Sequence, residues 1–187
     1  LYLHQNNIDI IQDHHIQKSL TKIKKADLCN NIGASVYTID ELKAVIDAEI
    51  YTVVQIPINI FDIHLYQYLK LKSSKIKINA RSIFLQGALI NSQTNQNKIN
   101  NNHFKSIKNY IQHFKSETNI NDRELIKTTF EFLNCLELID SLLIGTTNID
   151  NLTSSINLLH TKMKAIKYSK ALKLSSSPKE WANPQNW

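Results

Sequence analysis

The chain has 187 residues, a formal net charge of +6, 42% hydrophobic residues, and only three glycines and three prolines. This length and composition suit a globular protein with a buried core, but the chain is short for the roughly 250 residues of a complete (β/α)₈ barrel. The sequence contains no apolar run of about 18 residues, which argues against a membrane-spanning helix, and its basic residues are spread along the chain, which argues against nucleic acid as a partner.

Short apolar segments typical of β-strands alternate with helical patterns along the chain. We predict strands at residues 1–4, 32–37, 53–58, 76–83 and 142–145. Helical patterns lie between successive strands, with apolar residues three and four positions apart, as in Ile16-Leu20-Ile23. The segment 53–58 is apolar at successive positions, which indicates a strand buried on both faces of a parallel sheet. The sequence therefore predicts a series of βα units.

Local signals mark where some elements begin and end. Thr38 and Glu41 have the spacing of a capping box, so we expect a helix to begin close to Thr38. Pro57 cannot donate a hydrogen bond to a neighbouring strand and is expected at the end of its strand. The fourth and fifth strands are separated by a polar loop at residues 91–102, a candidate substrate loop, and by two further helical patterns. A helix at 149–160 and a tail at 161–187 follow, and we expect the tail to pack back on the body of the protein.

Histidines, cysteines and lysine clusters give little functional signal. Cys29 and Cys135 have neither metal-ligand nor disulfide spacing, and without a signal peptide a reducing cytoplasm is the predicted location. The adjacent pair His14 and His15 has no acid or cysteine at ligand spacing, so we predict no metal site. The lysines at 22, 24 and 25 are interpreted as a solvated surface, with a polyanion partner as the alternative.

Polar residues follow the predicted strands at the ends where parallel α/β proteins bind ligands. His4, Ser35 and Gln55 come from the first three strands, and Arg81 from the fourth. Gly145-Thr146-Thr147-Asn148 follows the fifth strand and precedes a helix, whose unpaired N–H groups and dipole suit a phosphate. The same four residues could simply cap the helix.

Four segments together resemble the aldo/keto reductase family, in its order and at about its spacing. They are IGASVYT at 32–38, VQIPINIFD at 54–62, ARSIFLQGAL at 80–89 and IGTTN at 144–148, and the closing Asn-Pro-x-x-Trp resembles an ending found in bacterial members. The resemblance implies an α/β fold, a partial (β/α)₈ TIM barrel made of strands four to eight, with the N-terminal barrel strands missing. Residues 1–187 would then form a single domain.

The resemblance assigns roles to residues at the first four strand ends. His4 falls where the family keeps a catalytic histidine that orients the substrate carbonyl. Ser35 and Gln55 match residues that hold the nicotinamide carboxamide, although Val36 replaces a common asparagine. Arg81 lies where many members stack an aromatic ring on the nicotinamide, so a guanidinium plane would have to stack instead. The segment that covers the pyrophosphate contributes Ser82, Phe84 and Gln86.

The fifth strand end would hold the other half of the cofactor. Gly145, Thr146, Thr147 and Asn148 match the loop near the 2′-phosphate and the adenosine ribose. Three residues one to two turns along the following helix join them: Asn151, Ser154 and Ser155. Many members have Glu-Asn at the last pair and a basic residue on the loop. This chain lacks both features, so the choice between NADP and NAD stays open. We expect NADP as the cofactor, with NAD as the alternative.

The resemblance implies an NAD(P)H-dependent oxidoreductase that reduces an aldehyde or ketone, with a small-molecule carbonyl substrate and neither nucleic acid nor membrane as a partner. In the family, the aspartate, tyrosine and lysine that provide the proton precede the point where this chain starts. We therefore expect the chain alone to be inactive and marginally folded, although it holds most of the cofactor cradle. Two alternatives stay open: a catalytically degenerate nicotinamide-binding sensor or regulatory barrel, and an inactive truncated relic.

Overall fold

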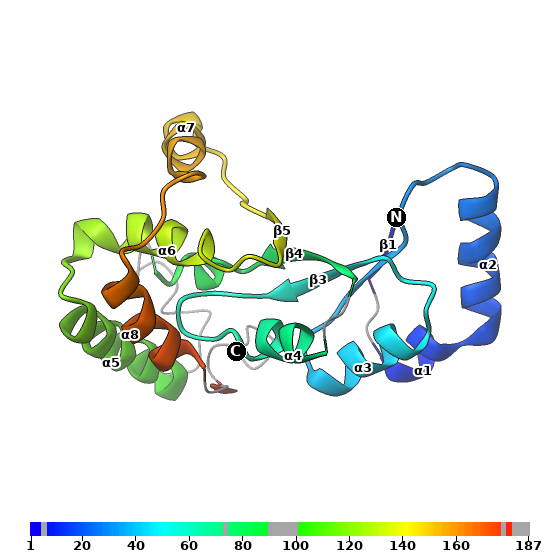
Figure 1. Cartoon of the computed structure of the whole chain (residues 1–187), viewed down its shortest axis with the longest axis horizontal. Helices are drawn as coiled ribbons and strands as arrows, with labels where there is room; N and C mark the ends of the chain where they lie inside the picture. Colours follow the sequence, from blue (N-terminus) through cyan, green and yellow to red (C-terminus); the bar gives the residue numbers. More distant parts are fainter. Residues whose placement is uncertain (5–6, 73–74, 90–100, 177–178, 181–187) are drawn as a thin grey trace. The chain divides into compact units, whose positions relative to one another are not determined.

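The computed structural model describes residues 1–4, 7–72, 75–89, 101–176 and 179–180 (Figure 1). They form two compact units whose segments alternate along the chain. The sheet unit contains Leu1–Pro57, Leu65–Arg81 and Leu138–Leu142. The helical unit contains Ile58–His64, Ser82–Glu137 and the described residues of Leu143–Trp187. The assignment of 1–187 to a single domain stays a prediction.

The sheet unit is built on five parallel strands that lie in the order of the chain. The strands are β1 (Tyr2–Leu3), β2 (Gly33–Ser35), β3 (Val53–Pro57), β4 (Lys77–Arg81) and β5 (Ile139–Leu142). The first four lie within the predicted segments, and β3 ends at Pro57 as expected. Alternating parallel strands and helices confirm the predicted α/β class.

The fifth strand was predicted three residues too late. The apolar run at 142–145 suggested a strand there, whereas β5 covers Ile139–Leu142. Pairing with β4 decides the position: Ile139 is opposite Ile78 and Leu142 is opposite Ala80, with a register shift between them. The carboxylate of Asp140 also accepts a hydrogen bond from the backbone N–H of Ile78 at 2.7 Å, which ties an acidic residue into the strand.

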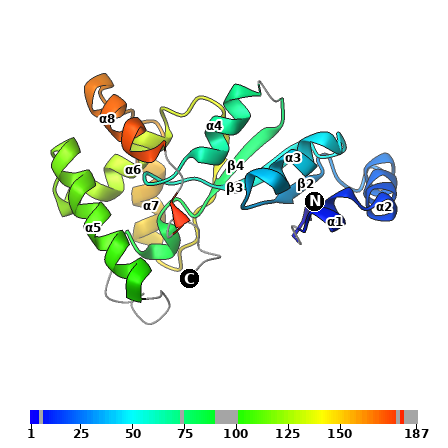
Figure 2. The same ribbon diagram turned by 90° about the horizontal axis from the view of Figure 1, so that it is seen from below.

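The two faces of the sheet differ in polarity because side chains alternate along each strand. One face carries fully buried apolar side chains such as Ala34, Val54 and Ile56. The sheet unit also contains α1 (Ile8–Gln12), α2 (His14–Lys25), α3 (Ile39–Asp47) and α4 (His64–Leu71, from Leu65 on). Figures 1 and 2 show α3 and α4 along one side of the strands. The short helix α1, which the sequence analysis did not predict, packs against α3.

The helix α3 begins at the predicted capping box. The hydroxyl of Thr38 accepts a hydrogen bond from the N–H of Glu41 at 3.2 Å. In return, the Glu41 carboxylate accepts from the N–H of Thr38 at 3.1 Å and from that of Tyr37 at 2.7 Å. The chain between β2 and α3 is therefore held on both sides of the helix start.

The helical unit contains α5 (Asn101–Thr118), α6 (Leu125–Leu133), α7 (Ile149–Leu158), α8 (Ala165–Ser175) and two 3₁₀ turns, η1 (Leu85–Gly87) and η2 (Asp122–Glu124). Its core contains the fully buried rings of Phe61, Phe114, Phe130 and Phe132. Of the predicted loop at 91–102, residues 91–100 lie outside the described residues, and residues 101 and 102 begin α5. The predicted tail contains α8, which packs against α5.

Beyond α8, the described part of the tail packs on the segment Ile58–His64 of the same unit. The N–H of Ile63 donates to the carbonyl of Ser175 at 3.1 Å. The ammonium of Lys179 donates to the carbonyls of Phe61 at 2.7 Å and Leu174 at 2.9 Å, and it lies 4.8 Å from the ring centre of Tyr110. For the described residues of 161–187, these contacts agree with the expectation that the tail packs back on the protein. Residues 177–178 and 181–187, with the Asn-Pro-x-x-Trp ending, lie outside the described residues.

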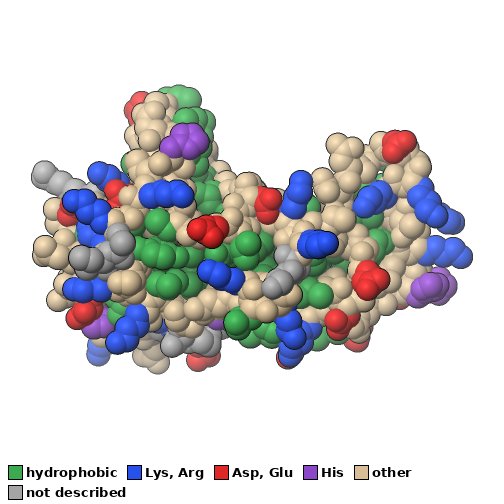
Figure 3. All heavy atoms as spheres, in the orientation of Figure 1, with side chains coloured by type: hydrophobic (Ala, Val, Ile, Leu, Met, Phe, Trp, Pro, Cys, Tyr) green, Lys and Arg blue, Asp and Glu red, His purple; other side chains and the backbone are tan. Residues whose placement is uncertain are grey.

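Helix α7 carries an exposed apolar stripe. Ile149, Leu152, Ile156 and Leu159 follow one another at intervals of three and four residues and are 71%, 39%, 54% and 37% exposed. Hydrophobic side chains are visible on this helix in the space-filling view, whereas basic side chains are scattered over the visible face (Figure 3). Within the described part of the chain, no helix is both long and apolar enough to cross a membrane.

Candidate functional site

Two predicted residues at adjacent strand ends form a hydrogen-bonded pair. Ser35 ends β2 and stands opposite Gln55 of β3, and the Ser35 hydroxyl donates to the Gln55 side-chain oxygen at 3.2 Å. Ser35 is only 4% exposed, and Gln55 is half-buried, so the pair is partly shielded from water. With its oxygen occupied, Gln55 can offer its amide N–H groups to a ligand, and the Ser35 oxygen retains acceptor capacity.

The same polar layer continues across β4 and β5 through two residues that the sequence analysis did not single out, Asn79 and Ser141. Asn79 of β4 is opposite Gln55 and Ser141 of β5. Its side-chain amide donates to the Tyr2 hydroxyl, and its oxygen accepts from the Ser141 hydroxyl at 2.7 Å. The signal was the alternation in β4, where Lys77, Asn79 and Arg81 alternate with apolar residues.

Arg81 ends β4 opposite Pro57 and is stacked on a neighbouring side chain. Its guanidinium carbon lies 3.7 Å from the centre of the Tyr37 ring, and its Nη2 donates to the Val36 carbonyl at 3.2 Å. Burial lowers the pKa of Arg81, and the nearby Tyr37 and Glu41 side chains partly offset this effect. Arg81 remains a cation at neutral pH because an arginine starts from such a high pKa.

His4 stands exposed directly after β1. Tyr2 is opposite Gly33 and Leu3 is opposite Ala34, so the next step of the register places His4 level with Ser35. This position agrees with the predicted one at the carboxyl end of the strand. Its assignment as a catalytic residue stays a prediction.

The segment predicted to cover the pyrophosphate has a strained backbone. Ser82, Leu85 and Gln86 all have φ near +50°, at 56°, 49° and 51°, and Gly87 follows with φ 88°. Left-handed conformations are costly for residues with a Cβ, particularly bulky ones, and such strain is concentrated at functional sites. The sequence analysis placed a functional segment here without identifying the strain.

Six of the predicted cofactor residues line a cavity of about 150 Å³ within the helical unit. Two apolar residues that were not predicted, Ile126 and Ile144, also line it. The predicted residues around the cavity are Phe84, Gly145, Thr146, Asn151, Ser154 and Ser155. The walls thus combine an aromatic ring and aliphatic groups with hydroxyl and amide groups, a lining typical of a site for one ring of a cofactor.

The start of α7 beside this cavity is capped by the chain itself. The Asn148 side chain accepts hydrogen bonds from the N–H groups of Asp150 at 2.8 Å and Asn151 at 3.1 Å. The Thr146 hydroxyl in turn accepts from the N–H of Asn148 at 3.1 Å. Thr147 is exposed and does not line the cavity. A phosphate at this helix start would have to displace the Asn148 side chain.

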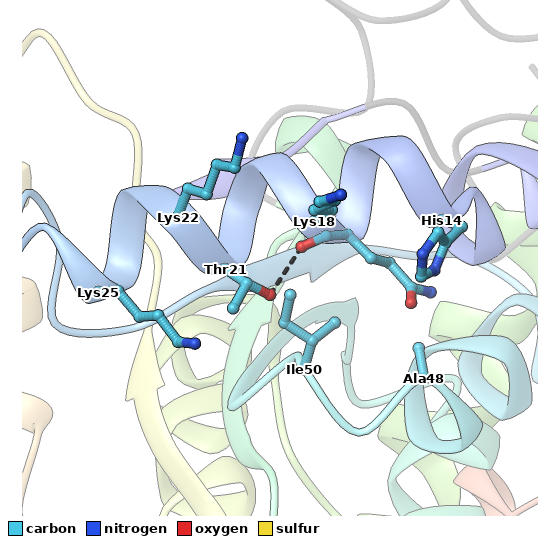
Figure 4. Close-up of a pocket in the computed structure, with 8 residues that line it drawn as sticks. His14, Lys18, Thr21, Lys22, Lys25, Ala48 and Ile50 are labelled. Carbon is cyan, nitrogen blue, oxygen red and sulfur yellow. Dashed lines mark hydrogen bonds between the residues drawn. The ribbon is translucent and has the colours of Figure 1, made fainter.

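A larger cavity, of about 530 Å³, lies in the sheet unit along α2 (Figure 4). His14, Lys18, Lys22 and Lys25 line it together with Gln17 and Thr21, and Ala48 and Ile50 lie opposite. Figure 4 shows Thr21 and Ile50 on facing sides of this space, with the Lys22 ammonium pointing away from Ile50. Two of the three clustered lysines thus border a cavity. The interpretation as a solvated surface and the polyanion alternative both stay open.

Neither a comparison with protein-family models nor a search of curated proteins finds a match to the chain. Solved structures do match. The chain superposes on an aldo-keto reductase from Bacillus halodurans, AKR11C1, with a TM-score of 0.75 for its holo form and 0.76 for its apo form. The sequence identities are 14% and 15%, and the match covers 96% of this chain and 62% of that one.

The fold of this chain is part of the aldo-keto reductase fold. A Gox0644 variant in complex with NADPH also matches, with a TM-score of 0.63, 14% identity, and coverage of 93% of this chain and 57% of that one. The chain therefore spans about three fifths of the length of these reductases. The predicted partial aldo-keto reductase barrel is confirmed at the level of the fold.

Among the described residues, no group of three or more His, Cys, Asp or Glu side chains could hold a metal ion.

Proposed function

We propose that the chain is the cofactor-binding part of an NAD(P)H-dependent oxidoreductase that reduces an aldehyde or ketone. The main support is the cavity in the helical unit, because six residues assigned to the cofactor from the sequence gather around it. The aldo-keto reductase fold supports the same proposal, since one matched protein is in complex with NADPH. We expect the substrate to be a small carbonyl compound.

The residues present fit a nicotinamide dinucleotide at two places. The cavity can take one flat ring between Phe84 and the aliphatic side chains, with the hydroxyls of Ser154 and Ser155 at its polar edge. The Gln55 amide can donate to a carboxamide oxygen, and Ser35 can accept from the carboxamide nitrogen. No lysine or arginine lines the cavity among the described residues, which keeps NAD open beside NADP.

A bound reduced nicotinamide would supply the hydride. The proton would have to come from a residue of this chain or from a donor outside it. Burial raises the pKa of both Tyr2 and Tyr51, which makes these phenols poorer acids. The Tyr51 hydroxyl already donates to the Ile11 carbonyl at 3.0 Å. Because a tyrosine general acid needs a lowered pKa, neither fits that role, whereas His4 is placed to orient a carbonyl. We therefore expect the isolated chain to bind cofactor without turnover.

Cofactor titration of the full chain tests this proposal. NADPH and NADH are added separately and binding is followed by the fluorescence of the reduced nicotinamide. Gly145→Phe places a ring at the cavity in a position where an added Cβ meets no atom within 4 Å, so it should weaken binding at least about tenfold with little loss of stability. Thr153→Phe, on an exposed position of α7 outside the cavity, is the matched control. Equal affinities of the two variants would contradict the proposal, whereas turnover by the chain alone would contradict only the expectation that its proton donor is missing.

Because neither Tyr2 nor Tyr51 fits the role of the acid, the second candidate, a nicotinamide-binding sensor or regulatory barrel, also stays open. Both candidates predict cofactor binding, but only the enzyme gains turnover when a segment that carries an acid is supplied. Assaying carbonyl reduction after such a segment is fused upstream of Leu1 separates them. A fused protein that binds NADPH but reduces no aldehyde or ketone would favour the sensor.

A further inference from the structure

Arg81 occupies the end of β4, at the edge of the sheet where parallel strands present ligand-binding residues. Gln55 and Ser35 lie at the corresponding ends of β3 and β2. A cation is therefore placed beside a polar, partly buried strand edge. Its role there depends on which of its groups are already engaged.

Contacts within the sheet unit hold the guanidinium in one orientation. One of its faces is covered by the Tyr37 ring at 3.7 Å, and Nη2 is bound to the Val36 carbonyl at 3.2 Å. Tyr37 is itself fixed, because its backbone N–H donates to the Glu41 carboxylate at 2.7 Å. Arg81 is thus oriented before any ligand arrives, which reduces the entropy lost on binding.

The charge of Arg81 is not matched by a carboxylate. Among the described residues, none of the ion pairs within 4.0 Å includes Arg81. Its Nε is buried and has no hydrogen-bond partner within the described part of the chain. Glu41 lies close enough to act on the charge, but its carboxylate already accepts from two backbone N–H groups. A buried donor left unpaired on a cation is unfavourable, and an acceptor oxygen would relieve it.

We propose that Arg81 binds an oxyanion of the ligand edge-on through its Nε–H, rather than stacking on the nicotinamide. The N–H groups of a guanidinium lie in its plane, so the Tyr37 ring on its face does not block Nε, and an oxyanion can bind there once the groups that bury Nε move aside. The oxyanion is a phosphate of the dinucleotide or a carboxylate on the carbonyl substrate. The inference rests on the proposed function only for the identity of the molecule that carries this group.

Titration of the full chain, labelled with ¹⁵N, tests this directly. The Arg81 Nε–H signal is identified by its loss in Arg81→Lys and is then followed during separate additions of inorganic pyrophosphate, pyruvate and sodium chloride. A saturating shift with pyrophosphate assigns the site to a phosphate, and one with pyruvate assigns it to a carboxylate. Sodium chloride at equal ionic strength should cause no saturating shift. If neither pyrophosphate nor pyruvate shifts the Arg81 Nε–H signal, the proposal is overturned, and this result does not depend on any variant.

Variants distinguish a specific site from general attraction. Arg81→Gln removes the charged guanidinium and leaves a neutral amide, and Arg81→Lys keeps the charge but has a methylene at the position of Nε. Each should weaken binding of the probe, by about 10- to 100-fold for Arg81→Gln. Lys77→Gln removes the same charge from an exposed position on the same strand and should change affinity less than about threefold. Equal losses in Arg81→Gln and Lys77→Gln would show a non-specific charge effect and overturn the proposal.

An NADPH titration separates this inference from the proposed function. If NADPH does not bind while a probe shifts the Arg81 signal, only the proposed function fails. If NADPH binds equally to the wild-type chain and Arg81→Gln, and neither probe moves the signal, only the role of Arg81 fails.

Discussion

Removal of the Glu41 carboxylate should destabilise the sheet unit more than any other single change at the start of α3. In Glu41→Ala, the N–H groups of Tyr37 and Thr38 lose a charged acceptor that lies 2.7 and 3.1 Å away. A hydrogen bond to a charged group contributes about 1.5–3 kcal/mol when shielded from water. Thr38 is exposed and Tyr37 only partly buried, so we expect a total loss of about 2 kcal/mol.

Urea denaturation followed by circular dichroism measures this effect. With a slope of about 2 kcal/mol per molar urea, the midpoint should fall by about 1 M. Thr38→Ala removes only the reciprocal bond and should cost about 1 kcal/mol. The control is Asp40→Ala in the same helical turn, where the fully exposed pair with Lys43 contributes little to stability. A midpoint for Glu41→Ala no lower than that of Asp40→Ala would refute the reasoning.

Three further predictions concern local geometry and ionisation. Gly33→Ala would place a Cβ 2.6 Å from a ring atom of Tyr2, so it should cost about 1–3 kcal/mol, and a double-mutant cycle in urea should show a smaller cost when Tyr2 is also alanine. At Gln86, where φ is 51°, glycine should be more stable than alanine by about 1 kcal/mol, and equal unfolding midpoints for the two variants would argue against a left-handed residue. Burial raises the pKa of Tyr110 from 10.0 to about 12, so the folded state favours the neutral phenol and stability should fall as the pH rises from 10 to 12. In Tyr110→Phe this fall should shrink, and an unchanged pH profile would show that another group titrates.

Local signals in the sequence predicted elements well where one residue type allows few alternatives. Pro57 cannot donate to a neighbouring strand, and β3 ends there. Thr38 and Glu41 satisfy each other's backbone only at a helix start, and α3 begins as predicted. Within the sheet unit, Ser35 and Gln55 were predicted together and are hydrogen-bonded. These predictions depend on residues near each other in sequence or on adjacent strands.

Predictions that depend on distant pairing were less accurate. The apolar run at 142–145 is as suitable for a strand as Ile139–Leu142, and only the register against β4 selects the latter. Helix α8 lies in the segment that was predicted only as a tail, although Tyr168, Ala171, Leu172 and Ser175 have helical spacing. The stacking of Arg81 on Tyr37 joins residues far apart in the sequence, which no local pattern indicates. The sequence left open whether residues 145–148 bind a phosphate or cap the helix, and the structure shows the Asn148 side chain accepting from the N–H groups of Asp150 and Asn151.

The strands of the sheet lie side by side in the order in which they are synthesised. Each of β2, β3 and β4 can therefore join the growing sheet as it leaves the ribosome, because its partner is already present. Residues 82–138 must emerge before β5 can complete the edge. The pairings among β1 to β4 span shorter stretches of chain than the pairing of β5 and should form before it. Nascent chains stalled before Leu138 should therefore already carry a four-stranded sheet.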